Sequence, residues 1–283
     1  MDARIVDNQL GELASVLATA ISQAEDVRLA VAFASANGVR LLNDALTGAL
    51  ERGAHVELLI GLDGQVTEPD AISLLFSLSE ERQNAHLYCH PPAALGSSYH
   101  PKVYWTKRED AATIVVGSSN LTRGGLRSNA EINVVIDAGS REEIVSDTFA
   151  AYLRLKLKAR TVEADEDLLA IYTELFQCQA QRARAAAEDA DARELRRALR
   201  TKLSSMGAAT ASEQDLVGWL RAVYEVLPEG EFSNQDVYAY EGQFRRLYPE
   251  NDNVQAKVRQ QLQVLRDMGI LEHVARGRWR KQD

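Results

Sequence analysis

The sequence is poor in several features that mark whole classes of protein. It holds 2 cysteines in 283 residues, and Cys89 and Cys178 do not have the spacing of a structural zinc site or a disulfide scaffold. No apolar run approaches the roughly 18 residues that a membrane helix needs. The opening MDARIVDNQL lacks the basic and apolar regions of a secretory signal. We therefore expect a reduced, cytoplasmic protein with no membrane partner.

Acidic side chains outnumber basic ones in the sequence, but the two kinds are unevenly distributed along the chain. The chain carries 32 Lys+Arg and 41 Asp+Glu, a net charge of −9. Residues 1–99 hold 5 basic and 13 acidic side chains, whereas residues 253–283 hold 7 basic and 3 acidic ones. A basic segment can bind phosphate while the rest stays acidic. The net charge therefore does not exclude a nucleic-acid partner, although a solvated basic face is the alternative.

Strand and helix patterns alternate in the first 137 residues. Strand-like apolar runs cover residues 27–35, 55–62, 86–90, 102–106, 113–117 and 131–137, and helical periodicity covers residues 9–24, 38–53 and 69–84. Strands interleaved with helices are typical of a layered α/β sheet. We therefore predict an α/β class for this part of the chain.

The middle of the chain, from Gly139 to about Ala211, has a helical pattern. Its stretch QRARAAAEDADARELRRALR mixes both charges without proline or glycine, which favours a solvated helix, a bridging arm or a subunit contact over a nucleic-acid surface. The small, polar run SSMGAATAS (204–212) is a plausible hinge.

The last 70 residues predict a small separate module. Residues 214–227 are amphipathic, Ser233 is a candidate helix N-cap, and 254–269 form a long helical pattern ended by Gly269. A short hairpin follows, with its turn at Arg276-Gly277. This order of helices followed by a hairpin is that of a winged helix, whose third helix can enter a major groove.

Four polar side chains are placed at the ends of predicted strands. His100 and Lys102 are two residues apart, so in a strand they emerge on one face. Asn120 follows the turn Gly117-Ser118-Ser119, and Glu131 opens the next predicted strand. Strand ends are where α/β sheets usually bind ligands.

These groups suit phosphoryl transfer without a metal. A neutral imidazole can attack phosphorus and form a covalent intermediate, while Lys102 and Asn120 can stabilise the phosphoryl oxygens. Glu131 could accept the second imidazole N–H. The turn at Ser118-Ser119-Asn120 could also begin a short helix whose free amides face an anion.

Three motifs follow one another in this region: His100-x-Lys102, then GSSN ending at Asn120, then Glu131. Their order resembles that of the phospholipase D superfamily. It is particularly similar to metal-independent nucleases and restriction endonucleases with one motif per chain. The resemblance covers about residues 25–137 and departs from the full motif in one respect, because Lys107 stands where that motif has Asp. Glu131 is the matching carboxylate. The resemblance implies that two protomers pair their motifs in one composite site, with no metal or other cofactor.

Several neighbouring residues have plainer interpretations. Ser118 and Ser119 fit turn formation better than nucleophilic roles, and Tyr104 and Trp105 fit the strand core. His90 has no partner at metal-ligand spacing. Arg123 could guide a phosphodiester backbone, as could Arg127, with a solvated loop as the equal alternative.

The C-terminal stretch YPENDNVQAKVRQQLQVLRDMGILEHVARGRW resembles the winged-helix domain of Dam-replacing and methyl-directed restriction endonucleases. That similarity implies recognition of double-stranded DNA. The expected DNA contacts are Asn253, Gln255, Lys257, Arg259 and Gln260 on the helix, and Arg276, Arg278 and Lys281 on phosphate. Alternatively, individual side chains of this set merely solvate the helix.

Together these patterns predict an α/β fold with a phospholipase-D-like layered mixed sheet and flanking helices, a helical connector and a C-terminal winged helix. The expected boundaries are 1–160 for the nuclease domain, 161–211 for the connector or dimerisation arm and 212–283 for the winged helix. We expect a homodimeric DNA endonuclease of a restriction or defence system. The alternatives are a DNA-binding regulator or targeting subunit whose first domain is inactive or partner-dependent, and another phosphodiesterase such as a phospholipase. The sequence leaves open the DNA site, its methylation and the cleavage position.

Overall fold

The computed structural model describes residues 1–9, 12–80, 82–92, 98–157, 161–206 and 212–282. The chain divides into two compact units, Met1–Ala192 and Arg193–Asp283. The predicted domain ends at residues 160 and 211, and residues 207–211 of the predicted hinge, lie outside the described ranges.

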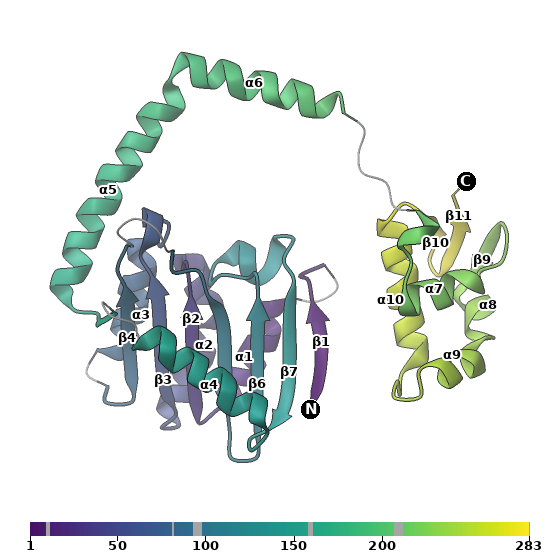
Figure 1. The fold of residues 1–283 in the computed structure, drawn as a ribbon, viewed down its shortest axis with the longest axis horizontal. Helices are drawn as coiled ribbons and strands as arrows, with labels where there is room; N and C mark the ends of the chain where they lie inside the picture. The colour runs from purple at the N-terminus through teal and green to yellow at the C-terminus, as the bar shows by residue number, and fades with distance from the viewer. Residues whose placement is uncertain (10–11, 81, 93–97, 158–160, 207–211, 283) are drawn as a thin grey trace. The chain divides into compact units, whose positions relative to one another are not determined.

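The first unit is built on an eight-stranded mixed sheet (Figure 1). Its strands are β1 (Asp2–Val6), β2 (Asp26–Val31), β3 (His55–Gly61), β4 (Ala85–His90), β5 (Lys102–Lys107), β6 (Ala111–Gly117), β7 (Asn133–Gly139) and β8 (Val162–Glu163). Their order is β1-β7-β6-β5-β2-β3-β4-β8. The neighbours β2, β3 and β4 are parallel, and every other pair is antiparallel. The predicted mixed α/β sheet is confirmed.

Helices cover the two faces of this sheet unequally. Helices α1 (Leu13–Gln23), α2 (Ala36–Glu51) and α3 (Pro69–Ser79) share one large core with alternate residues of the strands. Helix α4 (Glu143–Lys156) lies across the opposite face (Figure 1), where it packs on smaller clusters. Because both faces are covered, β2 and β3 are buried almost throughout, which explains their continuous apolar runs.

Two strands at the edges of the sheet were not predicted from the sequence. Strand β1 is mostly exposed and pairs antiparallel with β7, from Asp2 opposite Asp137 to Val6 opposite Asn133. Strand β8 has two residues and pairs with β4. Edge strands are held chiefly by backbone hydrogen bonds, which leave little mark on side-chain periodicity.

The predicted helical connector contains two helices, α5 (Glu166–Glu188) and α6 (Ala190–Ser204). Asp165 caps α5 by accepting a hydrogen bond from the Leu168 amide at 2.7 Å. The first half of α5 packs on the sheet unit through Tyr172, whose hydroxyl donates to the Thr67 carbonyl at 2.8 Å. The non-helical backbone of Asp189 separates the two helices.

The second unit has the predicted winged-helix order, with one extra strand and with two short helices, α8 and α9, where one was predicted. Its elements are α7 (Gly218–Glu225), β9 (Glu231–Ser233), α8 (Asn234–Tyr238), α9 (Glu241–Leu247), α10 (Val254–Asp267), β10 (Leu271–Ala275) and β11 (Arg278–Lys281). Strand β9 joins the predicted hairpin as an outer strand, in the order β10-β11-β9. Short helical turns η1 (Asp63–Gln65), η2 (Gly124–Ser128) and η3 (Glu213–Asp215) occur elsewhere in the chain.

Local signals in this unit are confirmed. Ser233 forms a capping box with Asp236 at the start of α8. Gly269 ends the region of α10 with a φ of +76°, a backbone conformation that favours glycine. The predicted apolar face of α10 is buried, as the exposures of Val254 (1%) and Leu262 (0%) show.

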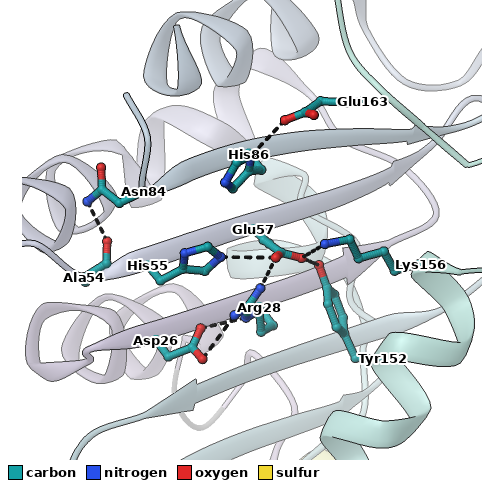
Figure 2. Close-up of polar contacts among 10 residues, drawn as sticks. All are labelled: Asp26, Arg28, Ala54, His55, Glu57, Asn84, His86, Tyr152, Lys156 and Glu163. Carbon is teal, nitrogen blue, oxygen red and sulfur yellow. Dashed lines mark hydrogen bonds and ion pairs between the residues drawn. The ribbon is translucent and has the colours of Figure 1, made fainter. Parts of the chain in front are cut away.

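A buried ionic network links the sheet to α4 (Figure 2). Arg28 on β2 binds Asp26 through Nε at 2.6 Å and also pairs with Glu57 on β3. The other oxygen of Glu57 accepts hydrogen bonds from the Tyr152 hydroxyl at 3.1 Å and from Lys156 Nζ at 2.8 Å. The network thus joins two central strands to the helix that crosses them.

The Glu57 carboxylate pairs with both Arg28 and Lys156 in this network. Burial opposes ionisation of its carboxyl, but hydrogen bonds from Lys156, Arg28 and His55 outweigh burial and lower its pKa to about 2. The pKa of Glu57 in the folded protein lies below the ordinary value of 4.5. The stability that the Glu57 carboxylate contributes is therefore fully present at pH values above 4.5. It is lost as the pH falls toward 2.

We predict that Glu57→Gln lowers the free energy of unfolding by about 3 kcal/mol, because it leaves buried cations without their carboxylate. The matched control is Glu163→Gln, which removes an exposed carboxylate that pairs with His86 at 2.8 Å and should cost less than about 1 kcal/mol. Native-state hydrogen exchange of β2 and β3 amides measures both. Equal losses in the two variants would contradict a special role for the buried network.

Candidate active site and nucleic-acid interface

His100 and Lys102 meet where β5 begins. The preceding loop is fixed by a hydrogen bond from the Ala32 amide to the Pro101 carbonyl at 2.9 Å. Lys102 stands opposite Val31 at the end of β2. Its ammonium lies 2.5 Å from Nδ1 and 3.1 Å from Nε2 of His100. The structure therefore brings the predicted imidazole and ammonium into direct contact.

The surroundings of Lys102 act on its charge. The residue is 7% exposed, and burial lowers the pKa of its ammonium, while the charge of Glu131 acts in the opposite direction. A partly desolvated ammonium interacts strongly with any anion that approaches. Lys102 is thus placed to stabilise negative charge next to the imidazole.

Asn120 is oriented by the backbone that follows β2. Its Oδ1 accepts a hydrogen bond from the Phe33 amide at 3.1 Å, which leaves the Asn120 NH₂ group to donate elsewhere. The ring of Phe33 also meets the imidazole of His100 edge-on, with centroids 5.6 Å apart. One residue therefore contacts both predicted catalytic groups.

Close backbone approach holds this turn in place. The Leu121 amide donates to the Phe33 carbonyl at 3.1 Å, and the Ser35 amide donates to the Leu121 carbonyl at 3.0 Å. A Cβ on Gly38 would lie 2.2 Å from that Leu121 oxygen. Only glycine allows α2 to approach the turn this closely.

Glu131 lies beside the turn that follows β6. It precedes β7, which begins at Asn133, and its carboxylate accepts hydrogen bonds from the Ser118 hydroxyl and from Asn129 Nδ2, the latter at 3.3 Å. The expected hydrogen bond to the His100 imidazole is absent from the contacts of the described residues. Glu131 instead affects the site through its charge on Lys102.

Asn133 is a site residue that sequence reasoning missed. It is 1% exposed, donates from Nδ2 to the Ser119 hydroxyl at 2.9 Å, and accepts from the Ser119 amide at 3.3 Å. The Tyr104 hydroxyl donates to the Ser119 carbonyl at 2.9 Å. The one available signal was a polar residue inside the apolar run INVVI.

The expected helix at Ser118-Ser119-Asn120 is wrong in position. The short helical turn η2 begins at Gly124, because the Asn120 side chain accepts from the Phe33 amide and the Leu121 backbone forms hydrogen bonds with Phe33 and Ser35 instead. Next to η2 is an open cavity of about 520 Å³, lined by Glu12, Arg123, Gly124, Arg127 and Ser128. Arg123 is exposed there, whereas Arg127 Nε pairs with Glu12 at 2.7 Å.

The plainer interpretations of three neighbouring residues agree with their contacts. Trp105 is 3% exposed, and its Nε1 donates to the Val145 carbonyl at 3.1 Å. Tyr104 is buried in the large core. The ring of His90 stacks on Tyr99 with centroids 4.5 Å apart. All three side chains are packed inside the sheet unit.

The predicted DNA-reading residues of α10 form two groups. Gln255 donates to Glu241 at 2.9 Å and Arg259 donates to the Tyr238 hydroxyl at 2.9 Å, so this pair lies against α9 and α8. Lys257 donates to Gln260 at 2.9 Å on another part of the helix surface, and burial lowers the pKa of Lys257. Asn253 is the N-cap of α10, and its side chain accepts a hydrogen bond from the Ala256 amide at 3.2 Å.

The three hairpin residues predicted to bind phosphate differ in their exposure to solvent. Arg276 and Arg278 are exposed. Lys281 is half-buried, with its ammonium 4.8 Å from the centre of the Tyr224 ring and 3.4 Å from Glu229. Arg276 and Arg278 are therefore more open to an incoming phosphate than Lys281.

Among the residues that the structure describes, no group of three or more His, Cys, Asp or Glu side chains could hold a metal ion. Nor does any helix of those residues have the length and apolar character needed to cross a membrane.

Two family models match the chain, one in each unit. Residues 17–153 match the PLD-like domain of cardiolipin synthase, and residues 215–281 match the Dam-replacing HTH domain. These matches confirm both families that the motifs indicated.

Solved structures of similar proteins include two short chains. Nuc, a phospholipase D family member from Salmonella typhimurium, is 17% identical, with a TM-score of 0.45 over 58% of this chain and 99% of its own. NucT from Helicobacter pylori is 14% identical over the same shares, with a TM-score of 0.45. Phosphatidylserine synthase from Haemophilus influenzae is 14% identical, with a TM-score of 0.43 over 64% of this chain and 46% of its own.

We predict that Lys102→Met raises the free energy of unfolding by about 1 kcal/mol, since it replaces a desolvated ammonium with an apolar chain of similar length. Because the folded pKa of Lys102 lies below 10.5, the gain should shrink as the pH rises from that lowered pKa toward 10.5. Urea unfolding at several pH values measures it. Lys107→Met, at the half-buried other end of β5, is the control, and an equal gain there would contradict the prediction.

Proposed function

We propose that this chain, which joins a PLD-like domain to a Dam-replacing HTH domain, is a DNA endonuclease of the restriction or defence type. The observation that carries the proposal is the contact of the Lys102 ammonium with the imidazole of His100, beside an Asn120 amide oriented to donate. Two free cysteines, one buried and one exposed, suit a role in the reducing cytoplasm.

In the proposed reaction, His100 is the nucleophile. A ring nitrogen of the neutral imidazole attacks the phosphorus of a DNA phosphodiester, the bond from phosphorus to the leaving oxygen breaks, and a phosphohistidine forms. Water then attacks the same phosphorus and releases the imidazole. This route divides one difficult displacement into two easier ones and requires no metal.

Lys102 and Asn120 stabilise the charge that develops on the phosphoryl oxygens. The Lys102 ammonium is partly desolvated, so its attraction to an anion is stronger than in water. The Asn120 amide supplies a hydrogen-bond donor, because its oxygen is already occupied by the Phe33 amide. In the resting site the ammonium hydrogen-bonds with the imidazole, and an incoming phosphate would draw it toward the phosphoryl oxygens.

One chain supplies one His-x-Lys pair, but the two steps need an acid for the leaving oxygen as well as a nucleophile. We infer that a second copy supplies its own His100 for that purpose, so that a homodimer holds one composite site. One imidazole would then be the nucleophile, while the other would give its proton to the leaving oxygen and, now neutral, accept a proton from the attacking water. Glu131, hydrogen-bonded to Ser118, would tune the charge of Lys102 rather than orient His100 of the same chain.

Site selection belongs to the winged helix in this proposal. The N-terminal residues of α10 would read bases in the major groove, and Arg276 and Arg278 on the hairpin would bind phosphate. Gln255 and Arg259 are exposed and already hydrogen-bonded to α9 and α8, which holds them in one orientation. Arg123, beside the catalytic turn, would bind the backbone near the cleaved bond.

We predict that the purified protein cleaves duplex DNA in excess EDTA and that His100→Ala abolishes cleavage, because the proposed nucleophile is then missing. Agarose-gel assays of methylated and unmethylated plasmid, followed by mapping of the ends, measure the rate and the position. Complete dependence on a divalent metal would contradict the mechanism. DNA binding without cleavage on every substrate would favour the regulator instead.

A second prediction concerns DNA affinity. Arg278→Ala should weaken binding to all sequences alike and reduce the slope of log K against log salt by about 1, because one phosphate contact is lost. Gln255→Ala should instead reduce discrimination between sites by about 1–3 kcal/mol.

Fluorescence anisotropy over a salt series separates these two effects. Arg221→Ala on α7, which removes one exposed charge paired with Glu225, is the matched control and should alter neither quantity. If Arg221→Ala and Arg278→Ala changed the salt slope equally, the hairpin would not be the phosphate-binding element.

A further inference from the structure

The open cavity beside η2 contains two exposed arginines of one helical turn. Arg123 and Arg127 are four residues apart, a spacing that brings side chains to the same side of a helix, and both line the cavity of about 520 Å³. Among the described residues of this lining, Glu12 is the one that carries a negative charge. Two guanidinium groups and one carboxylate leave the cavity with a net positive charge, which favours an anion.

The cavity borders the turn that ends at Asn120. A Cβ on Gly125 of η2 would lie 2.6 Å from the Asn120 carbonyl oxygen, so the two segments pack closely. After η2, Asn129 donates from Nδ2 to the Glu131 carboxylate at 3.3 Å. A DNA strand carries a phosphate for about every 3.4 Å of helix axis. A strand held at Asn120 would therefore also present phosphates to the cavity beside this turn.

Glu12 already occupies one of the two guanidinium groups. Its Oε2 lies 2.7 Å from Arg127 Nε, and the two side chains are 39% and 43% exposed. Glu12 is also the N-cap residue of α1, but its carboxylate caps none of the amides that begin this helix and contacts Arg127 instead. Ion pairs so open to water contribute little to stability, so a phosphate can replace this carboxylate.

The side chain of Asn8 holds the start of α1 against η2. Its Oδ1 accepts a hydrogen bond from the Leu13 amide at 3.1 Å, and its Nδ2 donates to the Gly125 carbonyl at 2.8 Å. The φ of Asn8 is +62°, a backbone conformation that asparagine adopts more readily than most residues. These two hydrogen bonds fix the segments that carry Glu12 and Arg127, so the contact between the two charges is built into the fold.

We propose that this cavity binds a second phosphate of the DNA backbone between Arg123 and Arg127, and that Glu12 blocks Arg127 until the phosphate displaces it. The choice of DNA as the ligand rests on the function proposed above, whereas the competition for Arg127 depends only on the charges of the cavity. Guanidinium groups bind phosphate oxygens with two parallel hydrogen bonds. The displaced Glu12 carboxylate stays at the positive end of the α1 dipole, which stabilises it. Glu12 thus lowers the affinity for DNA.

The test is a double-mutant cycle on DNA affinity, measured by fluorescence anisotropy with the full chain and a labelled duplex. Every chain carries His100→Ala, so that the duplex stays intact. Glu12→Gln should tighten binding about threefold to fivefold, because Arg127 is then free for phosphate. Arg127→Gln should weaken binding about fivefold to tenfold, because a charge-assisted contact is lost. With Arg127→Gln present, Glu12→Gln should change the affinity by less than about 1.5-fold, since the two effects are coupled.

Asp110→Asn is the matched control. It removes the same charge from an exposed carboxylate that pairs with Arg108 at 3.1 Å, between β5 and β6 and therefore at the far end of β5 from His100. It should change the affinity by less than about 1.5-fold, and circular dichroism should show every variant folded. Equal gains from Glu12→Gln and Asp110→Asn, or the same gain from Glu12→Gln with and without Arg127, would show an effect of net charge alone and overturn the proposal.

Other outcomes separate this proposal from the catalytic one. If the chain with intact His100 cleaves DNA but Glu12→Gln brings no gain in affinity, the endonuclease stands and the second phosphate site fails. If the gain appears and requires Arg127, but no duplex is cleaved, the phosphate site stands and the endonuclease fails. Absence of DNA binding in every variant would overturn both.

Discussion

The contact between the Lys102 ammonium and the His100 imidazole is the interaction on which the proposed chemistry depends. It exists because β5 starts opposite the end of β2, which places Lys102 level with Val31 and the preceding loop against Ala32. The same end of β2 continues to Phe33, which orients Asn120 through its amide and touches His100 through its ring. The strand register thus assembles cation, donor and imidazole before any phosphate arrives, as preorganised transition-state stabilisation requires.

Much of the fold and of the two families could be predicted from the sequence. Apolar runs located six strands, and the order of His100, Lys102, Asn120 and Glu131 indicated the family that the comparison confirms. Edge strands were missed because backbone pairing holds them. The hydrogen bond of the Ser118 hydroxyl to the Glu131 carboxylate was not foreseen, since it joins residues on either side of the loop between β6 and β7. The catalytic role of Glu131 stays a prediction.

Buried polar residues were the most informative signal that the sequence analysis overlooked. Arg28 and Glu57 interrupt two otherwise apolar strands, and in the fold they form the ionic network with Lys156. Asn133 begins a third strand and holds Ser119 in the turn before Asn120. A charged or amide side chain inside a continuous apolar strand should therefore be read as one end of a specific buried contact. Its partner cannot be named from spacing, because it comes from a distant element.

A covalent bond from His100 to phosphorus is the central step of the proposed reaction. The most direct measurement is peptide mass spectrometry of the enzyme mixed with DNA in EDTA and quenched at alkaline pH within the first turnover, where phosphohistidine survives. We expect a nucleotide adduct on the peptide that contains His100, and no adduct on that peptide in His100→Ala. Rapid cleavage with no adduct at any time point would contradict it, since water would then attack the DNA phosphorus directly.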